Sequence, residues 1–487
     1  MKTLTKSKYL LGLQCPRQVW VHFHEPDKVP EVDAATQKIF DEGNEVGELV
    51  KELFPGGIDL PTKDFLGNIQ LTKGSLNEGK PLFEPGFLTE DGLFSRGDIL
   101  LPTENGWDII EVKSGSKVKD INVEDVAFQK YCYQKCGLKI NKCYLMHLNN
   151  EYVRDGDLDV QELFIQEDIT ERVEEILPQV PEKIQLIKET VDDPISPENK
   201  IGSHCSKPYN CPFQEECWSF LPENHVAHLY RGGAKAFELI DGNIHALKDI
   251  PDEYKLNDKQ QIQKECAKTG KPHIHKESLK HFLSGLKYPL YYLDFETFST
   301  AVPKFDGLKP YQQVPFQYSL HVVDSPGAEP KHYSFLYKGK EDPRKEFISS
   351  LKKVLGEAGD IIVYNQSFEI SRLRETAAFL PEYNDWVESV VGRVVDLLIP
   401  FRNFSYYNPK QEGSASLKYV LPALTGKDYS HLGINNGSDA LLQFYNATYG
   451  NASEEEREKV FKDLEEYCEL DTLGMVWIVD ALGELIG

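Results

Sequence analysis

The chain has 487 residues, 27% of them charged, and a formal net charge of -24 at pH 7. This length exceeds what one hydrophobic core usually supports and predicts about two to four domains. The acidic balance argues against a surface that coats nucleic acid broadly, because phosphate binding depends mostly on Lys and Arg. No apolar run approaches the roughly 18 residues of a membrane-spanning helix, and the start lacks the apolar stretch of a signal peptide, so we expect a cytoplasmic protein without a membrane partner.

The first part of the chain predicts helices and then a strand-rich region. Apolar residues recur at helical spacing in residues 38–54, before the Pro-Gly-Gly stop at 55–57. We expect strands at 87–102, 107–114 and 142–149, the first two joined by the turn ENG at 104–106. A helix is expected at 123–137, between the second and third strands. Strands alternating with helices indicate an α/β protein.

The later part of the chain predicts a second α/β region. After a Cys-rich segment, a polar and Lys-rich stretch reaches about residue 285. Strands are then expected at 291–298, 316–323 and 360–365, with a helix from about Glu369 and another at the C-terminus. We therefore predict three parts: a domain at 1–220, a helical Lys-rich linker at 221–285, and a domain at 286–487.

Carboxylates and a lysine gather on the first predicted hairpin. Asp98 is expected to end a strand in SRGDILL, and Glu111 and Lys113, two apart on the next strand, project from one face. Two carboxylates can hold a divalent cation and a lysine can orient water for phosphodiester hydrolysis. Alternating charges on an exposed strand would explain the E-x-K pattern equally simply. Gln129 and Tyr133 follow at i,i+4 on one helix face, where they could contact a nucleic-acid backbone.

These residues resemble the PD-(D/E)XK nuclease motif in its RecB-like form. Asp98, Glu111 and Lys113 match its catalytic set, and the Gln-x-x-x-Tyr pair matches its helical motif. The resemblance covers roughly residues 5–220 and implies a restriction-endonuclease-like fold. The upstream helix at 40–49 lacks the histidine that many relatives carry, which leaves Glu84 as a candidate third metal ligand.

Four of the nine cysteines have the layout of a ligand set. Cys205, Cys211 and Cys217 are each separated by five residues, and Cys15 lies near the start. Thiolates spaced in this way can bind zinc or an iron–sulfur cluster, and the absence of C-x-x-C knuckles leans away from zinc. The others are interpreted as unrelated thiols: Cys132, Cys136, Cys143, Cys266 and Cys468.

The cysteine layout resembles that of AddB-type nucleases and of CRISPR-associated exonucleases with an iron–sulfur cluster. These relatives place one cysteine before the nuclease core and three after it. The resemblance implies a 4Fe–4S cluster, held by Cys15 and the later triplet, that staples the two ends of the first domain.

Acidic residues from separated segments mark the second α/β region. Asp294 and Glu296 share a face of the expected strand 291–298, where an unpaired buried carboxylate pair would be costly without a cation. Glu369 follows a strand, and Tyr467 and Asp471 stand at i,i+4 on the terminal helix. Four such acids could bind two metal ions for phosphoryl transfer, with the tyrosine orienting water.

This pattern resembles the DEDD exonuclease superfamily, in the branch with Tyr-x-x-x-Asp in its third motif. The resemblance implies an RNase H-like fold, Mg²⁺ or Mn²⁺, and 3′–5′ trimming. Glu369 departs from the aspartate that most relatives carry. Asp396 is left out of the expected ligand set, and Lys418 is given no role.

Together the two halves resemble a bacterial family of predicted nucleases of unknown function. The leading hypothesis is a metal-dependent nuclease with two active sites, acting on single-stranded or end-frayed DNA and possibly RNA. The alternatives are a nucleic-acid-binding or scaffolding protein with one or both folds inactive, and a zinc-stapled single nuclease. Aromatic residues at 404–407 could stack on bases, although such clusters more often belong to a core.

Overall fold

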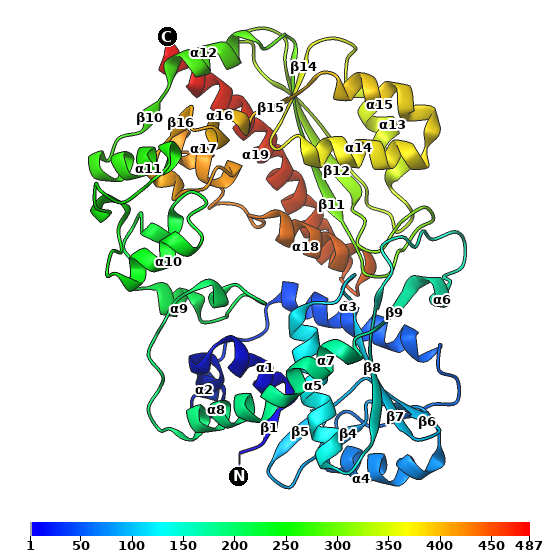
Figure 1. The fold of residues 1–487 in the computed structure, drawn as a ribbon. Coiled ribbons are helices and arrows are strands. Elements are labelled where there is room, and N and C mark those ends of the chain that lie inside the picture. Colours follow the sequence, from blue (N-terminus) through cyan, green and yellow to red (C-terminus); the bar gives the residue numbers. More distant parts are fainter. Residues whose placement is uncertain (1) are drawn as a thin grey trace. The chain divides into compact units, whose positions relative to one another are not determined.

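The computed structural model describes residues 2–487, which form two compact units. The first unit comprises Met1–Ser219 and Thr300–Gln312, and the second comprises Phe220–Ser299 and Gln313–Gly487. Both units mix helices with mixed β-sheets, as the α/β prediction required (Figure 1). Residues 221–285, expected as a linker, lie within the second unit and are largely helical. None of the helices in residues 2–487 combines the length and apolar character needed to cross a membrane.

The first unit contains a six-stranded sheet of order β2-β3-β6-β7-β8-β9 and a three-stranded sheet of order β1-β5-β4. The strands are β1 (Leu4–Thr5), β2 (Ile58–Asp59), β3 (Leu82–Phe83), β4 (Gly86–Leu88), β5 (Leu93–Arg96), β6 (Ile99–Thr103), β7 (Gly106–Lys113), β8 (Ile140–Leu148) and β9 (Phe164–Asp168). The helices are α1 (Lys6–Gln14), α2 (Pro16–His24), α3 (Ala34–Lys51), α4 (Phe65–Ser75), α5 (Asp120–Lys135), α6 (Val160–Leu163), α7 (Thr170–Ile176), α8 (Val180–Asp192) and α9 (Gln214–Trp218).

Strand β7 carries buried apolar residues on both faces, because helices cover both faces. Ile109 packs into a core with α1, α5 and α8, whereas Ile110 packs into a second core with α3. Since side chains alternate along a strand, Glu111 and Lys113 share the α5 face with Ile109. This alternation brings the strand's charged residues against one face of α5.

The expected strand at 87–102 is broken into three. Thr89 caps a tight turn, accepting the Leu93 N–H at 2.9 Å and separating β4 from β5. Gly97 and Asp98 then interrupt the strand before β6. Asp98 therefore precedes a strand, where the sequence placed it at a strand's end. The neighbouring predictions for β7, β8 and α5 are confirmed.

Residues 300–312, which connect β11 to β12, belong to the first unit. Ala301 and Val302 are buried in the same core as α3. Arg154 N–H donates to the carbonyl of Leu308 at 3.0 Å, and its guanidinium donates to the carbonyl of Pro303 at 2.9 Å. The connection is thus part of the first unit's folded structure.

The second unit is built on a five-stranded sheet of order β13-β12-β11-β14-β15. Its strands are β10 (His273–Ile274), β11 (Leu290–Phe298), β12 (Val314–Val323), β13 (Lys331–Leu336), β14 (Asp360–Val363), β15 (Val394–Asp396) and β16 (Tyr406–Tyr407). Its helices are α10 (Ala234–Asp241), α11 (Asp258–Thr269), α12 (Lys276–Ser284), α13 (Arg344–Val354), α14 (Ser367–Phe379), α15 (Asn384–Val391), α16 (Ile399–Arg402), α17 (Leu417–Thr425), α18 (Gly437–Tyr449) and α19 (Glu454–Ile486).

The central strand β11 is covered on both faces. Leu293 and Phe295 pack into a core with α13, α14 and α15 on one face. The long helix α19, which begins at a capping box on Ser453, lies against the other face (Figure 1). The alternate residues Asp294 and Glu296 therefore point toward α19, beneath a helix that also carries acidic residues. The expected strands at β11, β12 and β14 are confirmed, whereas β13 and β15 were not foreseen.

Candidate active sites

Glu111 is the centre of the first candidate site and is 1% exposed. Lys113 Nζ donates to its Oε1 at 2.6 Å. Gln129 Nε2 donates to Oε2 at 2.6 Å. The structure thus brings together the strand and helix residues that the sequence singled out. Asp98 joins them by accepting the Val112 backbone N–H at 2.6 Å.

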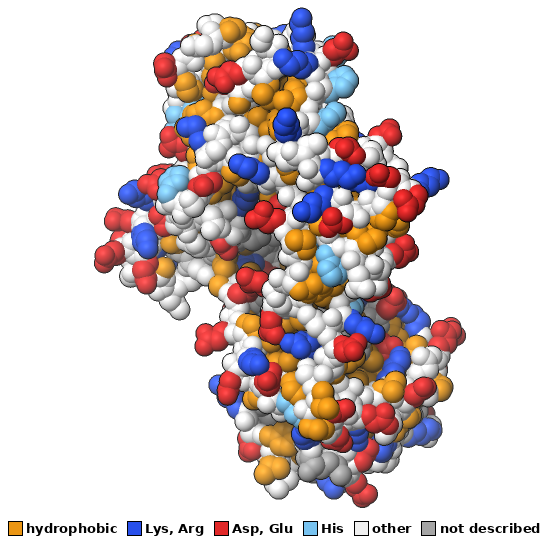
Figure 2. All heavy atoms as spheres, turned by 90° about the vertical axis from the view of Figure 1, so that its left-hand side faces the viewer, with side chains coloured by type: hydrophobic (Ala, Val, Ile, Leu, Met, Phe, Trp, Pro, Cys, Tyr) orange, Lys and Arg blue, Asp and Glu red, His pale blue; other side chains and the backbone are white. Residues whose placement is uncertain are grey.

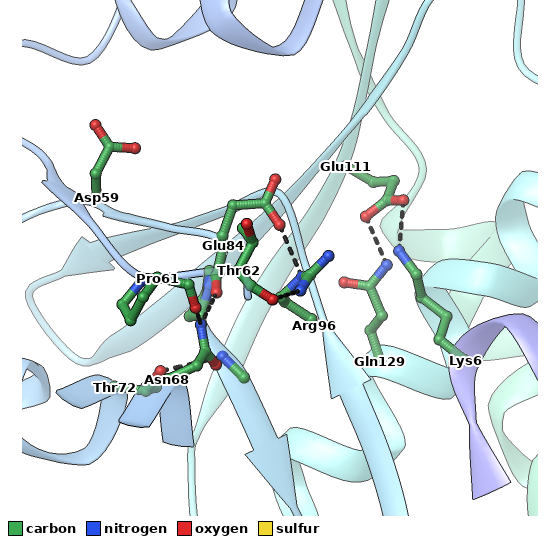
Figure 3. Close-up of polar contacts among 12 residues, drawn as sticks. Lys6, Asp59, Pro61, Thr62, Asn68, Thr72, Glu84, Arg96, Glu111 and Gln129 are labelled. Carbon is green, nitrogen blue, oxygen red and sulfur yellow. Dashed lines mark hydrogen bonds and ion pairs between the residues drawn. The ribbon is translucent and has the colours of Figure 1, made fainter. Parts of the chain in front are cut away.

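Two members of this cluster were missed from the sequence. Lys6 of α1 donates to Glu111 Oε1 at 2.8 Å (Figure 3). Its Nζ also lies 3.4 Å from Asp125 Oδ1. Asp125 also accepts from Lys113 at 2.9 Å. Asp125 lies four residues before Gln129, so the i,i+4 spacing used for Gln129 and Tyr133 extends to it. Lys6 comes from a distant segment, and no local pattern marks it.

The two lysines balance the charge of this cluster. Burial and Asp98 act to raise the pKa of Glu111, but Lys113 and Lys6 outweigh them and hold it below its usual range. Burial raises the pKa of Asp98, although the same lysines oppose the shift. Burial acts to lower the pKa of Lys6, yet Asp125 and Glu111 raise it overall. A metal ion binding Glu111 must therefore compete with ammonium groups already in contact with it.

Glu84 is held beside this cluster by a strained backbone. Its φ is 58°, in the left-handed region that non-glycine residues rarely adopt. Asn68 Nδ2 donates to the Glu84 carbonyl at 2.9 Å, and Arg96 pairs with the carboxylate at 2.9 Å (Figure 3). Burial raises the pKa of Glu84, with Arg96 opposing and Glu111 adding to the shift. Glu84 therefore influences Glu111 electrostatically, but within residues 2–487 the ligand atoms of Glu84, Asp98 and Glu111 do not all lie within 4.8 Å of one another.

Tyr133 lies behind the cluster and is 1% exposed. Its hydroxyl lies 3.5 Å from the Pro85 carbonyl. A Cβ at Gly97 would stand 2.5 Å from that hydroxyl and 2.6 Å from Gln129 Oε1. Only glycine therefore allows α5 to approach the start of β6 this closely. Tyr133 is buried against protein, so the expected contact between Tyr133 and a nucleic-acid backbone does not fit its position.

The four candidate ligand cysteines are all free thiols. Burial raises the pKa of Cys211 to about 11, and Cys15, Cys205 and Cys217 add to the shift, which places the four sulfurs near one another. Within residues 2–487, no three of these sulfurs lie all within 4.8 Å of one another. Tetrahedral zinc with Zn–S bonds of about 2.3 Å requires sulfurs about 3.8 Å apart. The four thiols are therefore not arranged as a compact zinc ligand group in this part of the chain.

Three carboxylates converge in the second candidate site. Ligand atoms of Asp294, Glu296 and Asp471 all lie within 4.8 Å of one another. Glu296 and Asp471 are buried, at 7% and 6% exposed. The sequence prediction for β11 and the terminal helix thus brings together the acids that it named.

These carboxylates lack enough positive charge among the described residues. Burial, together with Asp471, raises the pKa of Asp294 well above its usual value. Burial, Asp294 and Asp471 likewise raise the pKa of Glu296, with Lys418 opposing. Burial raises the pKa of Asp471 to about 6. Repulsion of this kind is relieved when a divalent cation binds between carboxylates.

Glu369, the fourth acid of the predicted set, lies in the first turn of α14 and is not part of the group of three within 4.8 Å. It is 2% exposed, and its Oε2 has no hydrogen-bond partner. Burial raises its pKa well above the usual value, and Asp294 adds to the shift. A buried carboxylate oxygen without a donor is what a metal ligand looks like before its ion binds. The residues present therefore fit a divalent metal.

Tyrosines and a lysine surround Asp471. Tyr429 donates its hydroxyl proton to Asp471 Oδ1 at 2.6 Å, and the Tyr467 hydroxyl also acts to lower the pKa of this carboxyl. Burial lowers the pKa of Lys418, although Asp471 and Glu296 oppose the shift. The sequence named Tyr467 but missed Tyr429, which lies in a loop. It also set aside Cys468, whose sulfur lies 3.7 Å from Asp294 Oδ2.

Asp396 is satisfied by protein donors. Its Oδ1 accepts the Asn365 and Leu398 N–H groups at 3.0 and 2.9 Å, and its Oδ2 lies 3.4 Å from Arg402. Leaving it out of the ligand set agrees with this arrangement. The aromatic residues at 404–407 are buried, with Phe404 stacked on Tyr407, so they form core and no base-stacking surface.

Comparison with known proteins gives partial matches. A family model described as "Domain of unknown function (DUF2779)" matches residues 291–416, which include Asp294, Glu296 and Glu369. The chain is similar to "Uncharacterized protein MG366 homolog" of Mycoplasma pneumoniae, 29% identical over 213 residues, covering 40% of this chain and 32% of that protein. It is also similar to "Uncharacterized protein UU173" of Ureaplasma parvum, 26% identical over 222 residues, covering 41% and 32%.

These matches agree with the expected likeness to a family of unknown function. The chain spans about a third of the length of the curated relatives that it matches. No solved structure matches it.

Proposed function

We propose that this protein is a metal-dependent nuclease with two active sites, a RecB-like PD-(D/E)XK site in the first unit and an RNase H-like DEDD exonuclease site in the second. The observation that carries the proposal is the convergence of Asp294, Glu296 and Asp471 within 4.8 Å, buried and with raised pKa values. Such a cluster has a clear use as a cation site and would otherwise destabilise the fold.

In the second site, Asp294, Glu296, Glu369 and Asp471 would hold Mg²⁺ or Mn²⁺. Bound metal would supply an activated water and charge stabilisation for the leaving oxygen. Tyr467 orients the water, while Tyr429 fixes the Asp471 carboxylate through its 2.6 Å hydrogen bond. Lys418, near Glu296 and Asp471, can contact a phosphate oxygen. This site would remove nucleotides from the 3′ end of DNA, and possibly RNA.

In the first site, Asp98, Glu111 and Glu84 are the proposed metal ligands. Lys113 positions the water, and Gln129 holds Glu111 in place through its 2.6 Å hydrogen bond. Lys6 holds the other carboxylate oxygen of Glu111 through its 2.8 Å contact. The four cysteines would hold a 4Fe–4S cluster with a structural role, joining the ends of the chain segment that forms this unit.

The proposed substrate is a single strand contacted locally. Figure 2 shows basic and acidic side chains interspersed over the face that it draws, without a continuous basic patch there. Such a surface suits a strand end that enters an active site more than a duplex held along its length.

The test is digestion of end-labelled single-stranded DNA and RNA by anaerobically purified protein with Mg²⁺ or Mn²⁺. We compare wild type with Glu111→Ala and Asp294→Ala, and use Asp324→Asn as the matched control because Asp324 is an exposed residue after β12. We expect each active-site variant to remove a different part of the product pattern, while the control digests like wild type.

The outcomes separate the alternatives. If Asp294→Ala abolishes digestion and Glu111→Ala does not change it, the second site is the single nuclease and the first unit is a binding module. The ion pairs of Glu111 with Lys6 and Lys113 favour this reading with a single active site, because the two lysines already neutralise the carboxylate. Intact substrate with every protein, wild type included, would refute the nuclease proposal and favour a nucleic-acid-binding or scaffolding protein.

A further inference from the structure

A second group of ligand-type side chains lies at the edge of the second unit's sheet. His321 of β12 and His332 of β13 are direct cross-strand partners, and their rings stack with centroids 4.5 Å apart. Glu469 of α19 places its Oε1 3.7 Å from His332 Nδ1. One ligand atom from each of the three residues lies within 4.8 Å of the other two. None of these residues belongs to the carboxylate site.

Hydroxyl groups hold the second nitrogen of each imidazole. His321 Nδ1 lies 2.8 Å from Thr472 Oγ1, and His332 Nε2 lies 2.9 Å from Ser319 Oγ. The two hydroxyls lie 2.7 Å apart. Histidine ligands of metals commonly use their other nitrogen in this way, which fixes the ring and its tautomer.

One arrangement of protons satisfies every contact in this network. In it, the Thr472 hydroxyl donates to the Glu469 carbonyl at 3.0 Å. Thr472 Oγ1 then accepts from Ser319 and from His321 Nδ1, while Ser319 Oγ accepts from His332 Nε2. Each ring thus carries its proton on the nitrogen facing a hydroxyl. The lone pairs of His321 Nε2 and His332 Nδ1 are left available for an ion.

Accessibility and charge suit an ion that enters from solvent. His321 is 3% exposed, whereas the side chains of His332 and Glu469 are 28% and 47% exposed. His332 lies on the edge strand β13 and Glu469 is half-exposed on α19, so both side chains can adjust without disturbing the core. Burial, with His332 adding to it, lowers the pKa of His321 to about 4, so its ring is neutral near pH 7. Neutral imidazole is the form that binds metals.

We propose that His321, His332 and Glu469 form a Zn²⁺ site, separate in place and chemistry from the Mg²⁺ or Mn²⁺ carboxylates. Two imidazoles and one carboxylate are a common zinc ligand set, with the fourth position left to water. Ligand atoms around tetrahedral zinc lie about 3.3 Å apart, given bonds of about 2.0 to 2.1 Å. The 3.7 Å separation of His332 and Glu469 is close to this spacing. Bound zinc would tie β12 and β13 to α19.

The test is Zn²⁺ titration of chelator-stripped full-length protein by calorimetry, in excess Mg²⁺ to occupy the carboxylate site. We compare wild type with His332→Ala and Glu469→Gln, both at part-exposed positions that tolerate substitution. We expect each variant to bind one equivalent of Zn²⁺ fewer than wild type. Ser319→Ala, which removes a supporting hydroxyl, should still bind this equivalent of Zn²⁺, with roughly 10- to 100-fold weaker affinity.

Two controls keep the result specific. His281→Ala changes an exposed histidine on α12 and should bind as many equivalents as wild type. Asp294→Asn should also retain the equivalent, because it alters only the carboxylate site. Zn²⁺ taken up by the cysteines during the titration is the same for every protein and cancels in the comparison. Equal stoichiometry and affinity for wild type, His332→Ala and Glu469→Gln would overturn the proposal.

Discussion

Asp471→Asn should stabilise the metal-free protein while removing its function. Burial raises the pKa of Asp471 from 3.8 to about 6. Each pKa unit corresponds to about 1.4 kcal/mol, so ionising Asp471 lowers the free energy of unfolding by roughly 3 kcal/mol. The carboxyl binds its proton more tightly in the folded protein than in the unfolded chain. The stabilisation that this proton provides is fully present below about pH 4 and is lost as pH rises through about 6.

The assay is thermal unfolding in chelator across this pH range. Near pH 7.5 the free energy of unfolding of Asp471→Asn should exceed that of wild type by at most roughly 3 kcal/mol, which corresponds to a rise of about 6 to 12 °C in the Tm of a unit of this size. The difference between Asp471→Asn and wild type should shrink as pH falls toward about 4, where both side chains are neutral. Added Mn²⁺ should then stabilise wild type more than the variant.

Asp396→Asn is the matched control in the same unit. Asp396 is equally buried but already accepts two backbone N–H groups and pairs with Arg402, so neutralising it should give no gain in stability. A lower Tm for Asp471→Asn than for wild type near pH 7.5 in chelator would refute the argument that burial of the ionised Asp471 carboxylate destabilises the folded protein.

Two further predictions concern the cysteines and the lysines. Cys211→Ser should abolish the iron content and visible absorption of anaerobically purified protein. Cys266→Ser, which changes a thiol outside the ligand set, should retain both. Iron retained by Cys211→Ser would contradict the assigned ligand set. Changing the exposed residues Lys271, Lys276 and Lys280 to Gln should weaken single-strand binding and reduce the slope of log affinity against log salt concentration by about 2. An unchanged slope would exclude residues 271–280 as a phosphate contact.

The sequence predicted the active-site residues that local periodicity marks. Glu111 and Lys113 follow from strand alternation, and Gln129 from helix spacing, and the structure brings all three into contact. Lys6 could not be predicted, because its partner Glu111 is 105 residues away and depends on how α1 packs against the sheet.

The same limit explains the misses in the second unit. Tyr429 lies in a loop whose path is set by tertiary packing, so no spacing connects it to Asp471. The edge strand β13 has four exposed residues at its start and lacks an apolar alternation, which left His332 unnoticed as a partner of His321. Gly97 was also passed over, since its role appears only when α5 packs against the start of β6.

The insertion of residues 300–312 into the first unit has a consequence for dissection of the protein. The chain crosses from one unit to the other three times, after residues 219, 299 and 312. A fragment ending at Ser219 would lose Ala301 and Val302 from its core and the carbonyl acceptors of Arg154. Neither unit is therefore a continuous stretch of chain, and limited proteolysis within 300–312 should loosen the first unit while leaving residues 2–219 uncut.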